Sequence, residues 1–258
     1  MDLEVERKIN KFLKQWQRGT VGLTSWLTSN GYSSQLLNRY KKSNWIEAIG
    51  SGAMKLSGDS ISVEGALYAL QKQAGSSIHF GGKTALAMLG KSHYLELAHK
   101  RVMLFGGATE ALPSWFTKYD WGVEVNYFSS SFLPSDFGMV EKEFKNFSID
   151  ISGAARAIME CMYLVPKQQD FIECYELMEG LNNLRPNVVQ QLLEKCSSVK
   201  VKRLFLYMAE KAKHPWLEYL DLENIDLGKG NRSLTQNGVY VSKYKITVPK
   251  ELESYGTL

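Results

Sequence analysis

Apolar positions along the first 60 residues follow a helical period and then the pattern of short strands. In residues 3–17 one apolar face recurs at spacings of four, three, one and three: Val5, Ile9, Phe12, Leu13 and Trp16. This spacing predicts an amphipathic helix that ends at Gly19-Thr20. A shorter helix is expected from Thr24 to about Asn30, followed by a turn at Asn30-Gly31.

The next helix carries the sharpest pattern in the chain. Ser33 or Ser34 is expected to cap it, because a serine hydroxyl accepts from the free N–H groups of the first turn. Amide and basic side chains recur on its outer face at i, i+3, i+4 and i+7: Gln35, Asn38, Arg39 and Lys42. Gln and Asn bond adenine edges, Arg bonds guanine edges, and Lys suits phosphate. A solvated amphipathic helix would also be polar there, but the absence of any acidic residue favours contact with DNA.

Two short strand-like runs follow this helix. Residues 45–49 and 53–56 flank Gly50-Ser51-Gly52 and can pair as a hairpin. The order helix, Gly-containing turn, helix and hairpin is that of a winged helix-turn-helix, which usually places one small helix in a DNA groove. We therefore predict a DNA-binding domain over residues 1–60. Its base-reading and backbone-positioning residues are predicted to be Ser33, Ser34, Gln35, Asn38, Arg39, Lys41, Lys42 and Lys55.

The rest of the chain changes from a mixed to a helical pattern. Residues 61–148 are expected to be mixed α/β, with helices over 62–75 and 83–89, strands over 78–80, 101–105 and 122–128, and a turn at Pro113-Ser114-Trp115. From Ile149 the pattern is helical, with helix starts at Ser152, Asp170, Pro186 and Val199, before a closing strand over 240–248. The predicted fold class is α+β: an N-terminal winged helix-turn-helix (1–60) and a second domain (61–258), mixed α/β over 61–148 and mainly helical over 149–258.

Positive charge is concentrated at the start of the chain. Residues 1–60 hold nine basic and five acidic residues, an excess that equals the net charge of +4 of the whole chain. Such a concentration suits a polyanionic partner. A second basic region lies on the helix predicted over 199–213, where a solvated helix face and a second contact surface for nucleic acid both remain open: Lys200, Lys202, Arg203 and Lys211.

Composition bounds the class of protein. Apolar residues make up 44% and charged residues 22% of the chain, as in soluble globular proteins. No segment approaches the roughly 18 apolar residues of a membrane helix, and the charged N-terminus lacks the apolar core of a signal peptide. We therefore expect a cytoplasmic protein without a membrane partner. Three widely spaced cysteines form no C-x-x-C pair and are expected to be buried thiols: Cys161, Cys174 and Cys196.

Motifs for catalysis, metals and cofactors are incomplete in this sequence. Gly82-Lys83-Thr84 resembles part of a phosphate-binding Walker A loop, but the first glycine of that motif is replaced by Ser77. We therefore interpret Gly81 to Leu86 as a structural turn. The four histidines show no metal-ligand spacing: His79, His93, His99 and His214. We expect no cofactor, no metal site and no enzymatic activity.

Two adjacent stretches carry a family resemblance. Residues 63–75 (V-E-G-A-L-Y-A-L-Q-K-Q-A-G) and 78–90 (I-H-F-G-G-K-T-A-L-A-M-L-G) resemble the "A-L-x-x-Q" helix and "G-G-x-T-A-L" turn of the AbiEi family. These proteins are antitoxin transcriptional regulators of bacterial abortive-infection, type IV toxin–antitoxin systems that defend against phage. Residues 151–160 (I-S-G-A-A-R-A-I-M-E) resemble the start of the family's antitoxin domain, with Ser152-Gly153 where the family often has a proline.

The resemblance implies functions beyond what spacing indicates. The protein would repress its own operon by binding operator DNA with inverted repeats. It would also counteract a cognate nucleotidyltransferase-like toxin without forming a stable complex with it.

Three alternatives remain at the level of sequence. An enzyme acting on nucleic acid, with the winged helix as a targeting module, predicts a tight cluster among Asp120, Glu124, Asp136, Glu141 and Glu143. A protein-interaction module predicts an apolar outer face on the helix over 33–43. A transcriptional regulator without a toxin partner would share the DNA-binding features alone.

Overall fold

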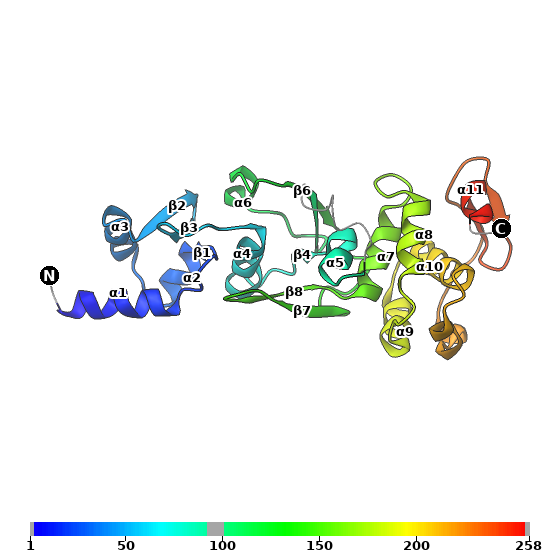
Figure 1. Cartoon of the computed structure of the whole chain (residues 1–258), viewed down its shortest axis with the longest axis horizontal. Coiled ribbons are helices and arrows are strands. Elements are labelled where there is room, and N and C mark those ends of the chain that lie inside the picture. Colours follow the sequence, from blue (N-terminus) through cyan, green and yellow to red (C-terminus); the bar gives the residue numbers. More distant parts are fainter. Residues whose placement is uncertain (1–2, 92–100, 256–258) are drawn as a thin grey trace.

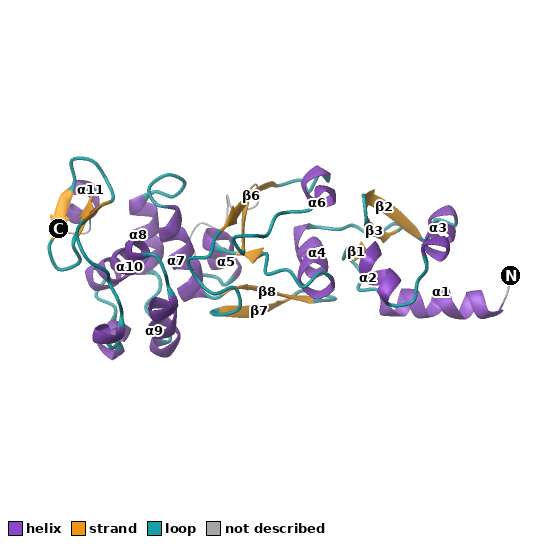
Figure 2. Cartoon of the chain, turned by 180° about the vertical axis from the view of Figure 1, so that it is seen from behind, coloured by secondary structure: helices purple, strands orange, loops and turns teal. Residues whose placement is uncertain are grey.

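The computed structural model of the chain describes residues 3–91 and 101–255. The elements follow one another along the long axis, with α1 at the N-terminal end and α11 at the other end (Figure 1). Helices and small sheets alternate, so the fold is of the α+β class. Figure 2 shows the strands in separate small sheets, interspersed with helices along this axis.

The N-terminal part consists of three helices and one small antiparallel sheet. Its elements are α1 (Leu3–Gln15), β1 (Gly22–Leu23), α2 (Thr24–Ser29), α3 (Ser34–Lys42), β2 (Ile46–Gly50) and β3 (Ala53–Leu56). The predicted hairpin is confirmed: β2 pairs with β3 in antiparallel register, with Glu47 opposite Lys55. Strand β1, which the sequence pattern did not indicate, joins the other edge of β3 and gives the order β1-β3-β2.

An aromatic cluster forms the core of this part. The Phe12 ring lies at its centre, with ring centroids 5.2 Å from Trp16, 4.9 Å from Tyr32 and 5.1 Å from Tyr40. Leu37 of α3 is buried beside them. The apolar faces predicted for the first and third helices therefore pack against each other, and the polar face of α3 is left outward.

The central part is built on a three-stranded sheet and a two-stranded ribbon. Its elements are α4 (Val63–Tyr68), the π-helical turn η1 (Ala69–Gln73), β4 (His79–Phe80), α5 (Gly82–Met88), β5 (Arg101–Gly106), α6 (Ser114–Lys118), β6 (Glu124–Ser129), β7 (Met139–Glu143) and β8 (Ser148–Ser152). Strand β5 pairs antiparallel with β4 and parallel with β6, while β7 and β8 pair antiparallel. Strand β4 also contacts β8, and α5 packs on α7 of the following part.

Two sequence-based predictions for this part are wrong. The segment read as a turn at Pro113-Ser114-Trp115 is the start of helix α6, with Pro113 in the extended conformation before it. Ile149, read as the start of the helical region, lies in strand β8, because it pairs with Lys142 of β7. Helix α7 begins only at Ala154.

The C-terminal part contains four α-helices followed by short elements. These are α7 (Ala154–Leu164), α8 (Phe171–Glu179), α9 (Pro186–Lys195), α10 (Val199–Lys211), the 3-10 turns η3 (Pro215–Tyr219) and η4 (Leu222–Asn224), β9 (Arg232–Ser233), β10 (Val239–Val241), β11 (Ile246–Val248) and α11 (Lys250–Ser254). Asp170 caps α8 and Pro186 occupies the first turn of α9, as predicted. The single closing strand predicted over 240–248 is instead the β10–β11 hairpin, whose turn includes Lys245 at a φ of 51°.

The three cysteines are buried and free, which confirms the prediction of structural thiols. Burial raises the pKa of each thiol, so the reactive thiolate form is disfavoured. Among the described residues, no helix combines the length and apolar character that a membrane span requires.

Candidate nucleic-acid interface

Helix α3 begins with a side-chain cap and contains no acidic residue. Ser33 Oγ accepts from the backbone N–H of Leu36 at 3.3 Å, which identifies Ser33 as the capping serine. The first turn leaves N–H groups with partial positive charge at this end of the helix. Arg39, Lys41 and Lys42 supply full positive charges in the last turn.

The outward face of α3 has no hydrogen-bond or ion-pair partner in residues 3–91 and 101–255. Six of the eight predicted DNA-binding side chains are exposed, and Lys41 is half-buried. Within the described part of the chain, no hydrogen bond or ion pair engages four of the side chains predicted to contact DNA: Gln35, Asn38, Arg39 and Lys42. The face is polar, so the alternative that required an apolar outer face lacks support. These side chains are available to an external partner of negative charge.

Lys55 differs from the other predicted DNA-binding residues. It is half-buried on β3, where its Nζ donates to the carbonyl oxygen of Asp59 at 2.9 Å. It also lies 3.5 Å from a carboxylate oxygen of Glu47 on the neighbouring strand. A phosphate contact by Lys55 therefore has to replace or share these two oxygens.

The second basic region does not form the predicted contact surface, because two of its four side chains are buried. Lys202 and Arg203 are only 4% and 1% exposed. Arg203 donates to the carbonyl oxygens of Leu227, Gly228, Gly230 and Lys245 at 2.7–3.1 Å, so it holds the C-terminal loops.

The other two basic side chains of this region are also engaged. Lys200 Nζ donates to the carbonyl oxygens of Tyr163 and Val165 at 2.6 and 2.7 Å. Lys211 Nζ donates to the carbonyl oxygen of Glu253 at 2.9 Å. The periodicity of helix α10 could not distinguish these internal donors from solvated cations.

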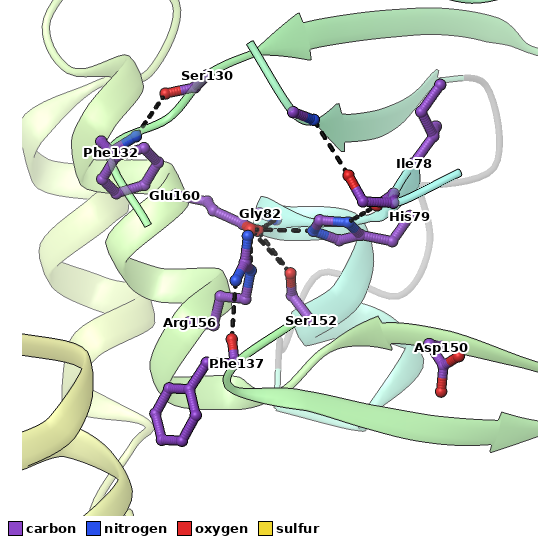
Figure 3. A network of polar contacts seen from close by, with 12 residues as sticks. Ile78, His79, Gly82, Ser130, Phe132, Phe137, Asp150, Ser152, Arg156 and Glu160 are labelled. Carbon is purple, nitrogen blue, oxygen red and sulfur yellow. Dashed lines mark hydrogen bonds and ion pairs between the residues drawn. The ribbon is translucent and has the colours of Figure 1, made fainter. Parts of the chain in front are cut away.

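A buried carboxylate organises the centre of the molecule. Glu160 of α7 accepts from Arg156 Nε at 2.9 Å, from the Ser152 hydroxyl at 2.8–2.9 Å and from the Gly82 N–H at 2.9 Å. His79 Nε2 lies 3.2 Å from the same carboxylate (Figure 3). Burial alone raises the pKa of a carboxyl, but the His79, Arg156 and Gly82 donors prevail and hold the pKa of Glu160 below its ordinary value.

The Gly81–Leu86 motif is part of this buried network. A side chain at Gly81 would overlap the carboxylate of Glu160 and the ring of Phe105. Gly82 has a φ of 51° and presents its N–H to Glu160. Thr84 Oγ1 accepts from the Met103 N–H at 2.9 Å and so ties α5 to β5. The interpretation of this motif as a structural turn is therefore confirmed.

The carboxylates required by the enzyme alternative do not cluster. All five are exposed, on the loop before β6, on β6, on the β6–β7 connection and on β7: Asp120, Glu124, Asp136, Glu141 and Glu143. Within the described ranges, no group of three or more His, Cys, Asp or Glu side chains is arranged to hold a metal ion. His93 and His99 lie outside the described residues.

Comparison with known families places this chain among antitoxin transcriptional regulators. Residues 5–97 match the N-terminal domain of the AbiEi antitoxin transcriptional regulators, and residues 99–249 match the transcriptional regulator, AbiEi antitoxin, of type IV toxin–antitoxin systems. The chain therefore belongs to the AbiEi family, and the resemblance found in residues 63–90 is confirmed. Members of this family are transcriptional regulators and antitoxins rather than enzymes.

A solved structure shares the fold. The crystal structure of the RV2827C protein from Mycobacterium tuberculosis has a TM-score of 0.56 to this chain and covers 95% of it, with 91% of its own chain aligned. The two sequences are 12% identical, so the likeness concerns the fold alone. No curated protein sequence matches this chain at a significant level.

Proposed function

We propose that this protein is a DNA-binding antitoxin that represses its own toxin–antitoxin operon. Residues 1–60 would form a winged helix-turn-helix domain, with α3 as the recognition helix and the β2–β3 hairpin as the wing. One observation carries the proposal: the outward face of α3 is exposed, free of acidic residues and without partners among the residues that the structure describes. Such a face can place amide and guanidinium groups against base edges in the major groove.

The side chains of this interface would take separate roles. Gln35, Asn38 and Arg39 would read bases, because their planar groups form paired hydrogen bonds with adenine or guanine. The other five would position the DNA backbone: Ser33, Ser34, Lys41, Lys42 and Lys55. Lys55 would do so after exchanging its contact with Glu47 for a phosphate oxygen.

The second function would belong to residues 61–258. Membership of the type IV antitoxin family supports the proposal that this part counteracts a nucleotidyltransferase-like toxin without a stable complex. The operator would contain inverted repeats, so that two copies of the winged helix bind related half-sites. The exposed face of α3 lies outside this part, so the two functions can be separated by mutation.

Arg39→Ala is the variant that tests this proposal. Loss of one bidentate contact to guanine should weaken specific operator binding by about 1–3 kcal/mol, or roughly tenfold to a hundredfold. Gel shifts on the protein's own promoter and on a scrambled duplex measure this loss. Arg232→Ala removes an exposed arginine from β9 and serves as the matched control, with unchanged binding expected.

The same variant separates repression from antitoxicity. Cells that express the proposed nucleotidyltransferase-like toxin should be rescued equally by wild-type protein and by Arg39→Ala. Operator binding unchanged by Arg39→Ala contradicts the base-reading role. Intact operator binding without rescue by the wild type would instead identify a transcriptional regulator without this toxin partner.

A further inference from the structure

A cavity of about 370 Å³ lies in the centre of the molecule, away from α3. The β4–β5 sheet, the connection after β6, and helices α7 and α9 contribute to its walls. Its polar side chains include three from the β-rich part and its connections and two from the helices: Ser77, His79, Ser130, Arg156 and Lys195. The volume is within the range of small-molecule sites.

The lining of this cavity is positively charged. Arg156 and Lys195 line it, and no described carboxylate does so. Lys195 is exposed at the end of α9, and none of the described acidic side chains forms an ion pair with it. Behind this lining, the buried Glu160 pairs with Arg156, and the half-buried Glu110 accepts from the Ser77 N–H. Lys195 therefore keeps its charge available to an anion.

Arg156 is the strongest indication of a ligand. It is only 5% exposed, and its Nε donates to Glu160 while its Nη1 donates to the carbonyl oxygens of Pro134 and Phe137. Within the described part of the chain, no acceptor bonds its Nη2. Nη2 is not one of the enclosed side-chain atoms without a partner, and Arg156 borders the cavity, so this end of the guanidinium is accessible from it. A ligand oxygen in the cavity would accept from Nη2.

His79 lies between the Ser77 loop and Glu160 at the base of the cavity. Its Nδ1 lies 2.6 Å from the carbonyl oxygen of Ser77, and its Nε2 lies 3.2 Å from the carboxylate of Glu160 (Figure 3). Both contacts fix the imidazole in place at the base of the cavity.

Hydroxyl groups complete the lining. Ser130 Oγ accepts from the Phe132 N–H at 3.2 Å, which leaves its own hydrogen free to donate into the cavity. Ser131 and Ser135 are exposed at the rim. Glu110 accepts from the N–H groups of Ser77 and Gly107 at 2.8 and 2.7 Å, so it holds the wall of the cavity in place.

We propose that this cavity binds the phosphate group of a small phosphorylated molecule. A phosphate offers several acceptor oxygens to the guanidinium of Arg156, the ammonium of Lys195 and the serine hydroxyls, which approach from different elements. A carboxylate would leave part of this donor set unused. The cavity is larger than one phosphate, so it also accommodates an organic group that is esterified to one of the phosphate oxygens.

Isothermal titration calorimetry of the full-length protein tests this site. The probes are inorganic phosphate, ribose 5-phosphate and adenosine 5′-monophosphate, with unphosphorylated ribose and adenosine as blanks. Saturable binding is expected for at least one phosphate-containing probe and for neither blank. Equal affinity for all three phosphates would identify free phosphate as the source, while tighter binding of an organic phosphate would indicate contacts with its organic part.

Two variants at the rim test whether the phosphate binds in this cavity. Lys195→Glu and Ser135→Asp each place a negative charge at the rim without altering a buried side chain, so both should fold and weaken binding at least tenfold. Lys118→Glu makes the same charge change on exposed α6 and should bind as the wild type does. The absence of saturable binding, or binding that Lys195→Glu leaves unchanged, overturns the proposal. Arg39→Ala should keep wild-type phosphate binding, so failure of the DNA-binding proposal and failure of this one are distinguishable.

Discussion

At the scale of single residues, burial decides what a charged side chain does. Arg39 and Arg203 are both basic residues on amphipathic helices. Arg39 is exposed and has no partner within the described residues, whereas Arg203 donates to four carbonyl oxygens. Glu160 is likewise enclosed by donors, so it is a structural carboxylate rather than a catalytic one.

Glu160→Gln should destabilise the protein strongly. The neutral amide leaves the Arg156 guanidinium buried without its counter-charge, which costs about 3–5 kcal/mol in the free energy of unfolding. Urea denaturation monitored by circular dichroism at pH 7 measures this change. Glu141→Gln alters an exposed carboxylate and should cost about 0.5 kcal/mol or less. Equal stability of the two variants would remove the central role assigned to Glu160.

Ionisation of Glu160 should also make the stability of the folded protein depend on pH. The folded-state pKa of Glu160 lies below its ordinary value of 4.5, so its ionised form stabilises the folded protein. This contribution is fully present above pH 4.5 and is lost as pH falls through the lower, folded-state pKa. Wild-type stability should therefore decline more steeply below pH 4.5 than the stability of Glu160→Gln.

At the scale of elements, close backbone approach determines how the helices dock. Helix α5 starts at a pair of glycines because the carboxylate of Glu160 and the ring of Phe105 occupy the space of a side chain at Gly81. Strands β2 and β3 similarly place Glu47 opposite Lys55, which restrains the lysine of the proposed wing. The close approach at Gly81 and the restraint on Lys55 both arise where two elements pack together, so neither can be seen in the pattern of one element alone.

Gly81→Ala tests the docking of α5. The added methyl group must displace Glu160 or Phe105, and overpacking of this kind costs about 1–3 kcal/mol. Gly180→Ala is the matched control, because its nearest neighbour is the carbonyl oxygen of Leu177 at 3.5 Å and its φ is −70°. Thermal unfolding should show a clear loss for Gly81→Ala and little change for Gly180→Ala. A neutral Gly81→Ala variant contradicts the close approach described here.

At the scale of the whole molecule, a few side chains join the N-terminal helices to the centre. Gln73 of η1 accepts from the Leu23 N–H at 2.7 Å and donates to the carbonyl oxygen of Val21 at 2.9 Å. Gly65 allows the backbone of Gly19 to cross α4, because a side chain there would overlap the Gly19 carbonyl. These contacts span residue 60, where a domain boundary is predicted, and the boundary stays a prediction.

Gln73→Leu should loosen the N-terminal part selectively. It removes the hydrogen bonds to β1 and to Val21 just before it, and leaves the Leu23 N–H and Val21 carbonyl without these partners, at a cost of about 1–3 kcal/mol. Amide exchange in β1 and β3 should become at least tenfold faster, while exchange in α7 stays unchanged. Gln17→Leu, an exposed substitution near α1, serves as the control. Uniformly faster exchange in both regions would show that the two parts unfold as one unit.

Local sequence patterns predicted most helices and one hairpin correctly. Helices α1, α3, α8 and α9 carry an apolar stripe or an end signal, such as the Ser33 cap and Pro186, within one or two turns of chain. Strands β1, β8 and the β10–β11 hairpin were missed or misread. Their identity depends on pairing with segments elsewhere, and short runs leave too weak a periodicity to indicate it.

The sequence by itself determined the class of this protein and the composition of its candidate DNA-binding helix. The outward side chains of α3 and the motifs of residues 63–90 each lie within a short segment, so both can be recognised from the sequence alone. Only the tertiary structure decided that Lys202 and Arg203 are internal, and that Arg156 and Lys195 line one cavity. The physical reason is that the sequence gives the charge of each side chain, whereas its burial and its partners depend on how distant elements pack together.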